Sequence, residues 1–122
     1  MGKTVVVIDN DRRVIQSFLI LYPKLESVKT FEDWRSAVNW INENFESISL
    51  VFLDVFMNDG CTGFDMIELF KHRPPIIMMS GDDTQWITLH ALQAGVNGFI
   101  EKPFAADELE RIMTPIVAGG GI

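Results

Sequence analysis

Short apolar runs of strand length alternate with stretches of helical pattern along the chain, and this alternation limits the fold more than any other feature. The expected strands cover residues 4–8, 27–31, 49–53, 76–79 and 97–101. The expected helices cover residues 11–22, 32–44, 64–71, 83–94 and 106–117. Strands that alternate with helices through short connections form a parallel sheet with helices on both faces. The sequence therefore predicts an α/β fold, with a doubly wound five-stranded sheet flanked by five helices.

The length and composition fit one globular domain. The chain has 122 residues, of which 48% are hydrophobic and 22% are charged. A chain of this kind buries a core without disulfide or metal cross-links. We expect residues 1–118 to form this domain, and the glycine-rich residues 119–122 to form a tail or the start of a linker.

The charge balance and the single cysteine restrict the function and the compartment. A formal charge of −7 argues against direct binding of nucleic acid, because phosphate backbones are bound by clusters of Lys and Arg. Cys61 has no second cysteine with which to form an internal disulfide, which fits a reducing cytosol. The sequence contains neither a signal-peptide pattern nor an apolar run of about 20 residues. We expect a cytoplasmic protein without membrane contact.

Polar side chains follow four of the expected strands at their carboxyl ends. Asp9, Asp54, Ser80 and Lys102 each come directly after one of these strands. Ligands of open α/β sheets bind outside the carboxyl ends of the strands, where the strand order reverses. Acidic groups, a hydroxyl and a lysine at one edge of a sheet predict a site for a hard cation and a phosphoryl group.

The acidic members of this set suit a magnesium ion. Asp9 and Asp11 flank Asn10, and Asp54 ends the central strand. Mg²⁺ takes oxygen ligands in octahedral geometry, usually one or two carboxylates with waters and phosphate oxygens. Carboxylates that gather without a counter-charge repel one another, and a divalent cation removes this cost. Asp11 has an alternative role, because an aspartate before a helix caps the first turn.

The remaining polar groups suit a phosphoryl group. Lys102 is a compact cation on a flexible stem, which pairs with a carboxylate at rest and with a phosphate oxygen after modification. Ser80 offers a hydroxyl donor, and Gly81 leaves room for the backbone to approach a ligand. A serine at a strand end is more often a simple turn residue. Ser80 is assigned to the predicted site only because Asp54 and Lys102 lie at neighbouring strand ends.

In this order and spacing, the segments make the chain resemble the receiver domain of two-component response regulators. The segments are Val7-Ile8-Asp9-Asn10-Asp11, Leu53-Asp54-Val55-Phe56-Met57, Gly63-Phe64, Met79-Ser80-Gly81, Ala94-Gly95 and Lys102-Pro103-Phe104. The resemblance runs from Lys3 to about Val117. It implies a flavodoxin-like sheet of strand order 2-1-3-4-5. It also implies Mg²⁺-dependent phosphotransfer from a histidine kinase to an aspartate, by a module that is not an enzyme with a turnover substrate.

The resemblance assigns the acidic residues to phosphorylation and metal binding. Asp54 is implied to be the phosphoacceptor. Asp9, Asn10 and Asp54 are implied to hold Mg²⁺, together with the backbone carbonyl of Phe56. The family normally has a carboxylate at the position of Asn10, so the affinity for Mg²⁺ is expected to be weakened, with Asp11 or Asp59 as compensating groups.

The resemblance also assigns the phosphoryl contacts and the output surface. Ser80, Gly81 and Lys102 are implied to bind the phosphoryl group, and Ser80 and Phe99 to form the switch. The output surface is implied to consist of the fourth helix, the fifth strand and the fifth helix. The implied partners are a sensor histidine kinase or phosphotransfer domain, an effector that the sequence does not identify, and a second copy of the chain bound through the output surface.

Two side chains are implied to set how long the phosphoryl group lasts. Phe56 lies two residues after Asp54, and Asp82 lies two residues after Ser80. In the family these positions flank the path of an attacking water. A bulky aromatic ring at the first position is expected to exclude water and to slow self-hydrolysis.

Two alternative functions stay open from the sequence. The first is a degenerate receiver, which binds partners without taking a phosphoryl group, because Asn10 and the loop of residues 58–62 depart from the family pattern. The second is a phosphohydrolase of the haloacid dehalogenase type, which also places an Asp-x-Asp after its first strand. Its acidic pair would come after the lysine, whereas Asp82-Asp83 precede Lys102 here, and Asp54 would have no role.

Overall fold

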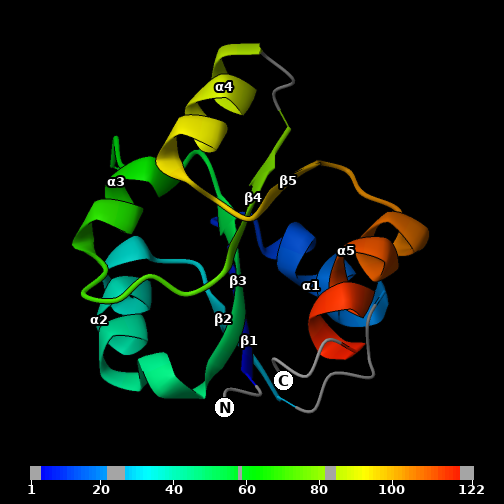
Figure 1. Cartoon of the computed structure of the whole chain (residues 1–122), viewed down its shortest axis with the longest axis horizontal. Helices are drawn as coiled ribbons and strands as arrows, with labels where there is room; N and C mark the ends of the chain where they lie inside the picture. The colour runs from blue at the N-terminus through cyan, green and yellow to red at the C-terminus, as the bar shows by residue number, and fades with distance from the viewer. Residues whose placement is uncertain (1–3, 22–26, 58, 82–84, 119–122) are drawn as a thin grey trace.

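The computed structural model describes residues 4–21, 27–57, 59–81 and 85–118, and they form one parallel sheet between two layers of helices (Figure 1). The five strands are β1 (Thr4–Ile8), β2 (Ser27–Phe31), β3 (Ile48–Asp54), β4 (Ile76–Ser80) and β5 (Gly98–Glu101). They pair in the order β2-β1-β3-β4-β5, and every pairing is parallel. The expected flavodoxin-like topology is confirmed.

The helices divide between the two faces of the sheet. They are α1 (Arg12–Leu21), α2 (Trp34–Asn44), α3 (Gly63–Leu69), α4 (Gln85–Ala94) and α5 (Ala106–Ala118), with a short 3₁₀ turn, η1 (Phe45–Ser47), before β3. In Figure 1, α2, α3 and α4 cover one face, and α1 and α5 cover the other. None of the helices in the described ranges is long and apolar enough to cross a membrane.

Each face of the sheet has its own apolar core. Successive strand residues point to opposite faces, so Val6 and Ile8 of β1 join the core under α2, α3 and α4. Val5 and Val7 join the core under α1 and α5. All seven residues of β3 are buried, as expected for a central strand that is covered on both faces.

Side-chain caps decide where two helices begin, and they move the expected boundaries. Asp33 accepts a hydrogen bond from the backbone N–H of Ser36, so α2 begins at Trp34 and not at residue 32. Thr62 and Asp65 form a reciprocal capping box, which starts α3 at Gly63, one residue earlier than predicted. The side-chain oxygens thereby satisfy backbone donors that the first turn leaves open.

The far end of α3 is held by a side chain of α2. The Nδ2 group of Asn42 donates to the carbonyl of Leu69, and Oδ1 of Asn42 accepts from the N–H of Lys71. The helix therefore ends at Leu69, before the predicted limit at residue 71.

Gly63 brings the start of α3 into close contact with the end of β3. Its N–H donates to the carbonyl of Val55 at 2.7 Å. A Cβ atom at Gly63 would lie 2.5 Å from the carbonyl oxygen of Asp54 and 2.8 Å from Cε of Met78. Only glycine fits this approach, which fixes the loop that follows Asp54.

Candidate functional site

The carboxyl ends of the central strands place the predicted polar residues at one edge of the sheet. Asp54 ends β3 and pairs in register with Met79, and Ser80 ends β4 and pairs with Glu101. Asp9 follows β1, and Lys102 follows β5. Parallel pairing in this strand order therefore brings together side chains that lie far apart in the sequence.

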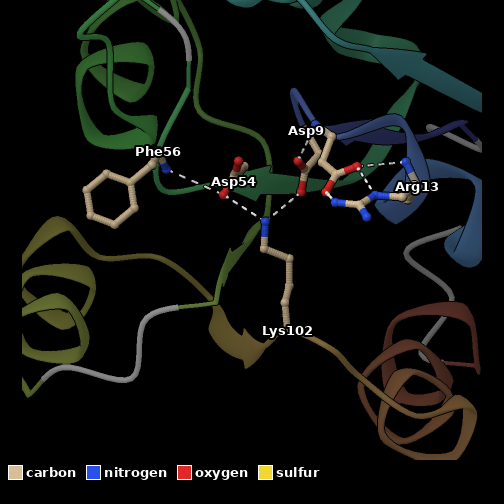
Figure 2. Close-up of polar contacts among 6 residues, drawn as sticks. Asp9, Arg13, Asp54, Phe56 and Lys102 are labelled. Carbon is tan, nitrogen blue, oxygen red and sulfur yellow. Dashed lines mark hydrogen bonds and ion pairs between the residues drawn. The ribbon is translucent and has the colours of Figure 1, made fainter.

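Lys102 joins the two buried carboxylates of this edge. Its Nζ donates to Oδ2 of Asp9 at 2.9 Å and to Oδ1 of Asp54 at 3.2 Å (Figure 2). Asp9 is 0% exposed and Asp54 is 3% exposed. Two charges of the same sign thus share one counter-charge in a place with little access to water.

Burial and the neighbouring charges shift the pKa values of Asp54 and Lys102. Burial, reinforced by the charge of Asp9, raises the pKa of Asp54 from 3.8 to about 6, although Lys102 and the N–H of Phe56 act in the other direction. Burial alone would lower the pKa of Lys102, but its hydrogen bond to Asp9 and the charge of Asp54 raise it above its ordinary value. Lys102 therefore stays charged, and Asp54 is ionised at neutral pH at a cost in free energy.

The oxygen donors at this edge fit a hard divalent cation. Asp9 and Asp54 supply two carboxylates, which matches the number that Mg²⁺ usually takes from a protein. Asn10 lies next in the chain, and its side chain carries an amide oxygen but no charge. Among the described residues, no three carboxylate, His or Cys side chains gather into a metal-binding group. A cation here would thus depend on two carboxylates with neutral oxygen donors.

Asp11 points its carboxylate toward Arg13, and not into the cluster. The backbone N–H of Arg13 donates to Oδ1 of Asp11 at 2.9 Å, so Asp11 caps the start of α1, as its alternative role predicted. The guanidinium adds a hydrogen bond to each oxygen, at 3.2 Å to Oδ1 and 3.1 Å to Oδ2. These bonds hold the pKa of Asp11 below its usual value. Asp59, the other compensating group considered, is exposed in its loop with a positive φ of 60°.

Ser80 is buried beside the cluster and is tied to Lys102 through the backbone. Ser80 is 1% exposed, and its carbonyl accepts from the N–H of Lys102 at 2.8 Å. Gly81 is exposed, and a Cβ atom added to it would meet nothing within 4 Å. Phe99 is half-buried in β5 and packs against the core under α4. Ser80 and Phe99 thus lie on the neighbouring strands β4 and β5.

Phe56 is an exposed residue in the loop that follows Asp54. Its N–H donates to Oδ1 of Asp54 at 3.4 Å, and its side chain is 42% exposed. In the view of Figure 2 its ring points away from Lys102. Asp82, the second residue expected to affect hydrolysis, lies outside the described residues.

Two features of this edge were not predicted from the sequence. The first is the pairing of Arg13 with Asp11, for which the only signal is their spacing of two residues at a helix start. The second is the steric need for Gly63, which was named from the sequence only as part of the Gly63-Phe64 segment of the family resemblance. Both depend on side-chain directions and close approaches that residue patterns do not contain.

Known proteins share the sequence and the fold of this chain. Residues 5–114 match the family model of the response regulator receiver domain. The chemotaxis protein CheY of Bacillus subtilis is 30% identical over 113 residues, which cover 89% of this chain and 92% of CheY. The regulatory protein VanR of Enterococcus faecium is also 30% identical over 113 residues, but these cover 47% of VanR. This chain thus spans about half of that relative.

Solved structures agree in fold at lower sequence identity. A two-component response regulator from Clostridium difficile superposes with a TM-score of 0.84 at 21% identity, over 96% of this chain and 97% of that structure. The family match also decides against the haloacid dehalogenase alternative. The sheet order, the matched residues and the level of identity lead to one conclusion: the chain belongs to the response regulator receiver domain family.

Proposed function

We propose that Asp54 is the phosphoacceptor of this receiver domain and takes its phosphoryl group from a sensor histidine kinase or a phosphotransfer domain. The observation that carries the proposal is the contact of one lysine, Lys102, with the buried carboxylates of Asp54 and Asp9. Such a surplus of buried negative charge is costly for a purely structural site. The surplus of buried negative charge is instead typical of a site at which a carboxylate binds a cation and acts as a nucleophile.

In the proposed step, a carboxylate oxygen of Asp54 attacks phosphorus and forms an acyl phosphate. The bond from phosphorus to the donor nitrogen breaks, and its electron pair stays with the donor histidine. Asp54 is ionised above its pKa of about 6, so the nucleophilic form is available at neutral pH. Lys102 stays beside the new phosphoryl oxygens, and Ser80 and Gly81 contribute contacts from the end of β4.

Mg²⁺ is the proposed cofactor, held by Asp9, Asn10, Asp54 and the backbone carbonyl of Phe56. When bound, the cation neutralises charge on the phosphoryl oxygens. Asp9 is already oriented for this role, because its Oδ1 accepts from the N–H of Asp11 at 2.8 Å. The neutral Asn10 makes the proposed site weaker than one with three carboxylates.

The proposed response is a change on the surface of α4, β5 and α5. Phosphorylation would draw the Ser80 hydroxyl toward Asp54 and let Phe99 turn further into the space it vacates. The backbone bond from Lys102 to Ser80 and the half-buried ring of Phe99 support this route. A partner or a second copy of the chain would bind the changed surface.

Intact mass after incubation with acetyl phosphate and Mg²⁺ tests the proposal. The native chain is expected to gain one phosphoryl group, and the gain is expected to disappear with EDTA or in Asp54→Asn. Asp59→Asn is the matched control, since it neutralises an exposed aspartate five residues away. A native chain that never gains a phosphoryl group would instead indicate a degenerate receiver that acts by binding alone.

A further inference from the structure

Asp11 lies directly beside the proposed cation site, but its carboxylate is turned away from it. Its N–H donates to Oδ1 of Asp9 at 2.8 Å, which places the Asp11 backbone against the buried cluster. Its carboxylate instead accepts two hydrogen bonds from the Arg13 guanidinium, from Nε to Oδ1 at 3.2 Å and from Nη2 to Oδ2 at 3.1 Å. In the view of Figure 2, Asp9 separates Arg13 from Asp54.

The two oxygens of Asp11 are held in different ways. Oδ1 accepts from the backbone N–H of Arg13, which forms the helix cap, and also from Nε of the Arg13 side chain. Oδ2 receives its hydrogen bond from Nη2 of the Arg13 side chain. Removal of the guanidinium would therefore leave the cap in place and release Oδ2.

A released Asp11 carboxylate would have a reason to turn toward the cluster. Asp11 and Arg13 line one cavity of about 290 Å³ together with Lys102, whose Nζ contacts Asp9 and Asp54. The cluster beside it has two carboxylates and one lysine, with the neutral Asn10 where a further negative charge would strengthen cation binding. Asp11 would supply that charge from within the same loop.

The pair of Arg13 and Asp11 is weak enough to be displaced. The Arg13 side chain is 88% exposed and that of Asp11 is 38% exposed. Exposed ion pairs of this kind shift an equilibrium by about fivefold or less. Arg13 therefore competes with a cation for Asp11 without holding it permanently.

We propose that Arg13 is a positioning residue that lowers the Mg²⁺ affinity of this receiver domain by holding the Asp11 carboxylate away from Asp9 and Asp54. The inference rests on the proposed cation site. It adds a third carboxylate, outside the set assigned to Mg²⁺ above, and a residue that controls when this carboxylate takes part.

The test measures Mg²⁺ affinity in the unphosphorylated protein. The dissociation constant is obtained from the rise of the urea unfolding midpoint with Mg²⁺ concentration, at constant ionic strength. Arg13→Gln is expected to bind Mg²⁺ about two- to fivefold more tightly than the native chain. Arg13→Lys is expected to give a smaller increase in Mg²⁺ affinity. Lysine keeps the positive charge, but it lacks the planar guanidinium that donates two parallel hydrogen bonds to a carboxylate.

Arg12→Gln separates positioning from simple loss of positive charge. Arg12 is the neighbouring residue and is also exposed, but it pairs with Glu32 at 3.3 Å, not with Asp11. Its removal is expected to change the affinity less than twofold. Equal effects of Arg12→Gln and Arg13→Gln would overturn the proposal.

Asp11→Asn supplies the second control. Asparagine caps a helix about as well as aspartate, so the fold of α1 is kept while the charge is lost. Arg13→Gln is expected to have no effect on Mg²⁺ affinity in this background, and an undiminished effect would overturn the proposal. Asp54→Asn tests the site itself: if Mg²⁺ stabilises it as much as the native chain, the proposed cation site fails, and the role of Arg13 fails with it.

Discussion

At the scale of single residues, the site is one positive charge short. Lys102 contacts both Asp9 and Asp54, and these carboxylates are almost completely buried. The ammonium group can neutralise only one of them. Burial, reinforced by the charge of Asp9, raises the pKa of Asp54 to about 6, and the ionised site is therefore less stable than a neutral one of the same shape.

Asp54→Asn is therefore expected to stabilise the protein at pH 7.5 in EDTA, by roughly 1–3 kcal/mol in the free energy of unfolding. The pKa of Asp54 is higher in the folded chain, at about 6, than its ordinary value of 3.8. The folded state thus binds the additional proton between these pH values, and the contribution of Asp54 to stability falls as the pH rises through this window. Above it the ionised carboxylate is destabilising, and the asparagine avoids this cost.

Urea unfolding at pH 7.5 and pH 5 measures this effect, with Asp59→Asn as the exposed control. The stabilisation should shrink at pH 5, where the native Asp54 is largely protonated. It should also shrink when Mg²⁺ is added at pH 7.5. An equal gain at both pH values would contradict the assigned origin of the effect.

Phe56→Asn is expected to shorten the lifetime of the acyl phosphate several-fold. Phe56 lies two residues beyond Asp54, and its backbone N–H donates to the Asp54 carboxylate. A polar amide there would orient a water that the phenyl ring does not bind. The decay of phosphorylated protein after removal of the donor measures the rate. Phe56→Leu, which keeps an apolar side chain, should decay at nearly the native rate; an unchanged rate in Phe56→Asn would refute the idea.

At the scale of elements, residue patterns predicted each strand and α-helix of the described residues, because burial on one or two faces gives the apolar residues a regular spacing; they did not predict the short 3₁₀ turn η1. They also predicted that Asp9, Asp54, Ser80 and Lys102 share one edge of the sheet, since this follows from parallel strands alone. The direction of the Asp11 carboxylate could not be predicted, because it depends on competition between Arg13 and the cluster. The predicted start of α3, residue 64, was one residue too late, because the capping box extends the helix to Gly63.

Gly63→Ala is expected to destabilise the protein by about 1–3 kcal/mol, the usual cost of overpacking a core. The new Cβ would lie 2.5 Å from the Asp54 carbonyl oxygen, so either α3 or the end of β3 must move. Thermal or urea unfolding measures the change. Gly81→Ala is the matched control, since its Cβ would meet nothing within 4 Å and should leave stability within about 0.5 kcal/mol. Equal stabilities of the two variants would contradict the packing argument.

At the scale of the whole molecule, the two faces of the sheet have different surroundings. The core under α1 and α5 is separate from the core under α2, α3 and α4. On α4, Leu89 is 57% exposed and Leu92 is 70% exposed, next to β5. Exposed apolar side chains on a predicted output surface favour a protein partner or a second copy of the chain.

Activation with beryllofluoride and Mg²⁺ is expected to increase self-association, and the double variant Leu89→Ser, Leu92→Ser is expected to prevent the increase. Sedimentation velocity at several protein concentrations measures the association. Ile20→Ser is the control, because Ile20 is 76% exposed but lies on α1. A dimer that forms equally well in the double variant would exclude this part of α4 from the interface.

The anchoring of α3 has a consequence for where the domain can move. The N–H of Gly63, its first residue, donates to the carbonyl of Val55 directly after β3, and the carbonyl of Leu69, its last residue, accepts from Asn42 of α2. A helix fixed at both ends opens rarely, so we expect its amide protons to exchange slowly with deuterium in both the resting and the phosphorylated chain. The amides of β5, which bond to β4 beside Ser80, should be the ones whose exchange rates change. If Asp54 is phosphorylated as proposed, the resulting movement is therefore expected on the β5 side of Asp54 and not on the α3 side.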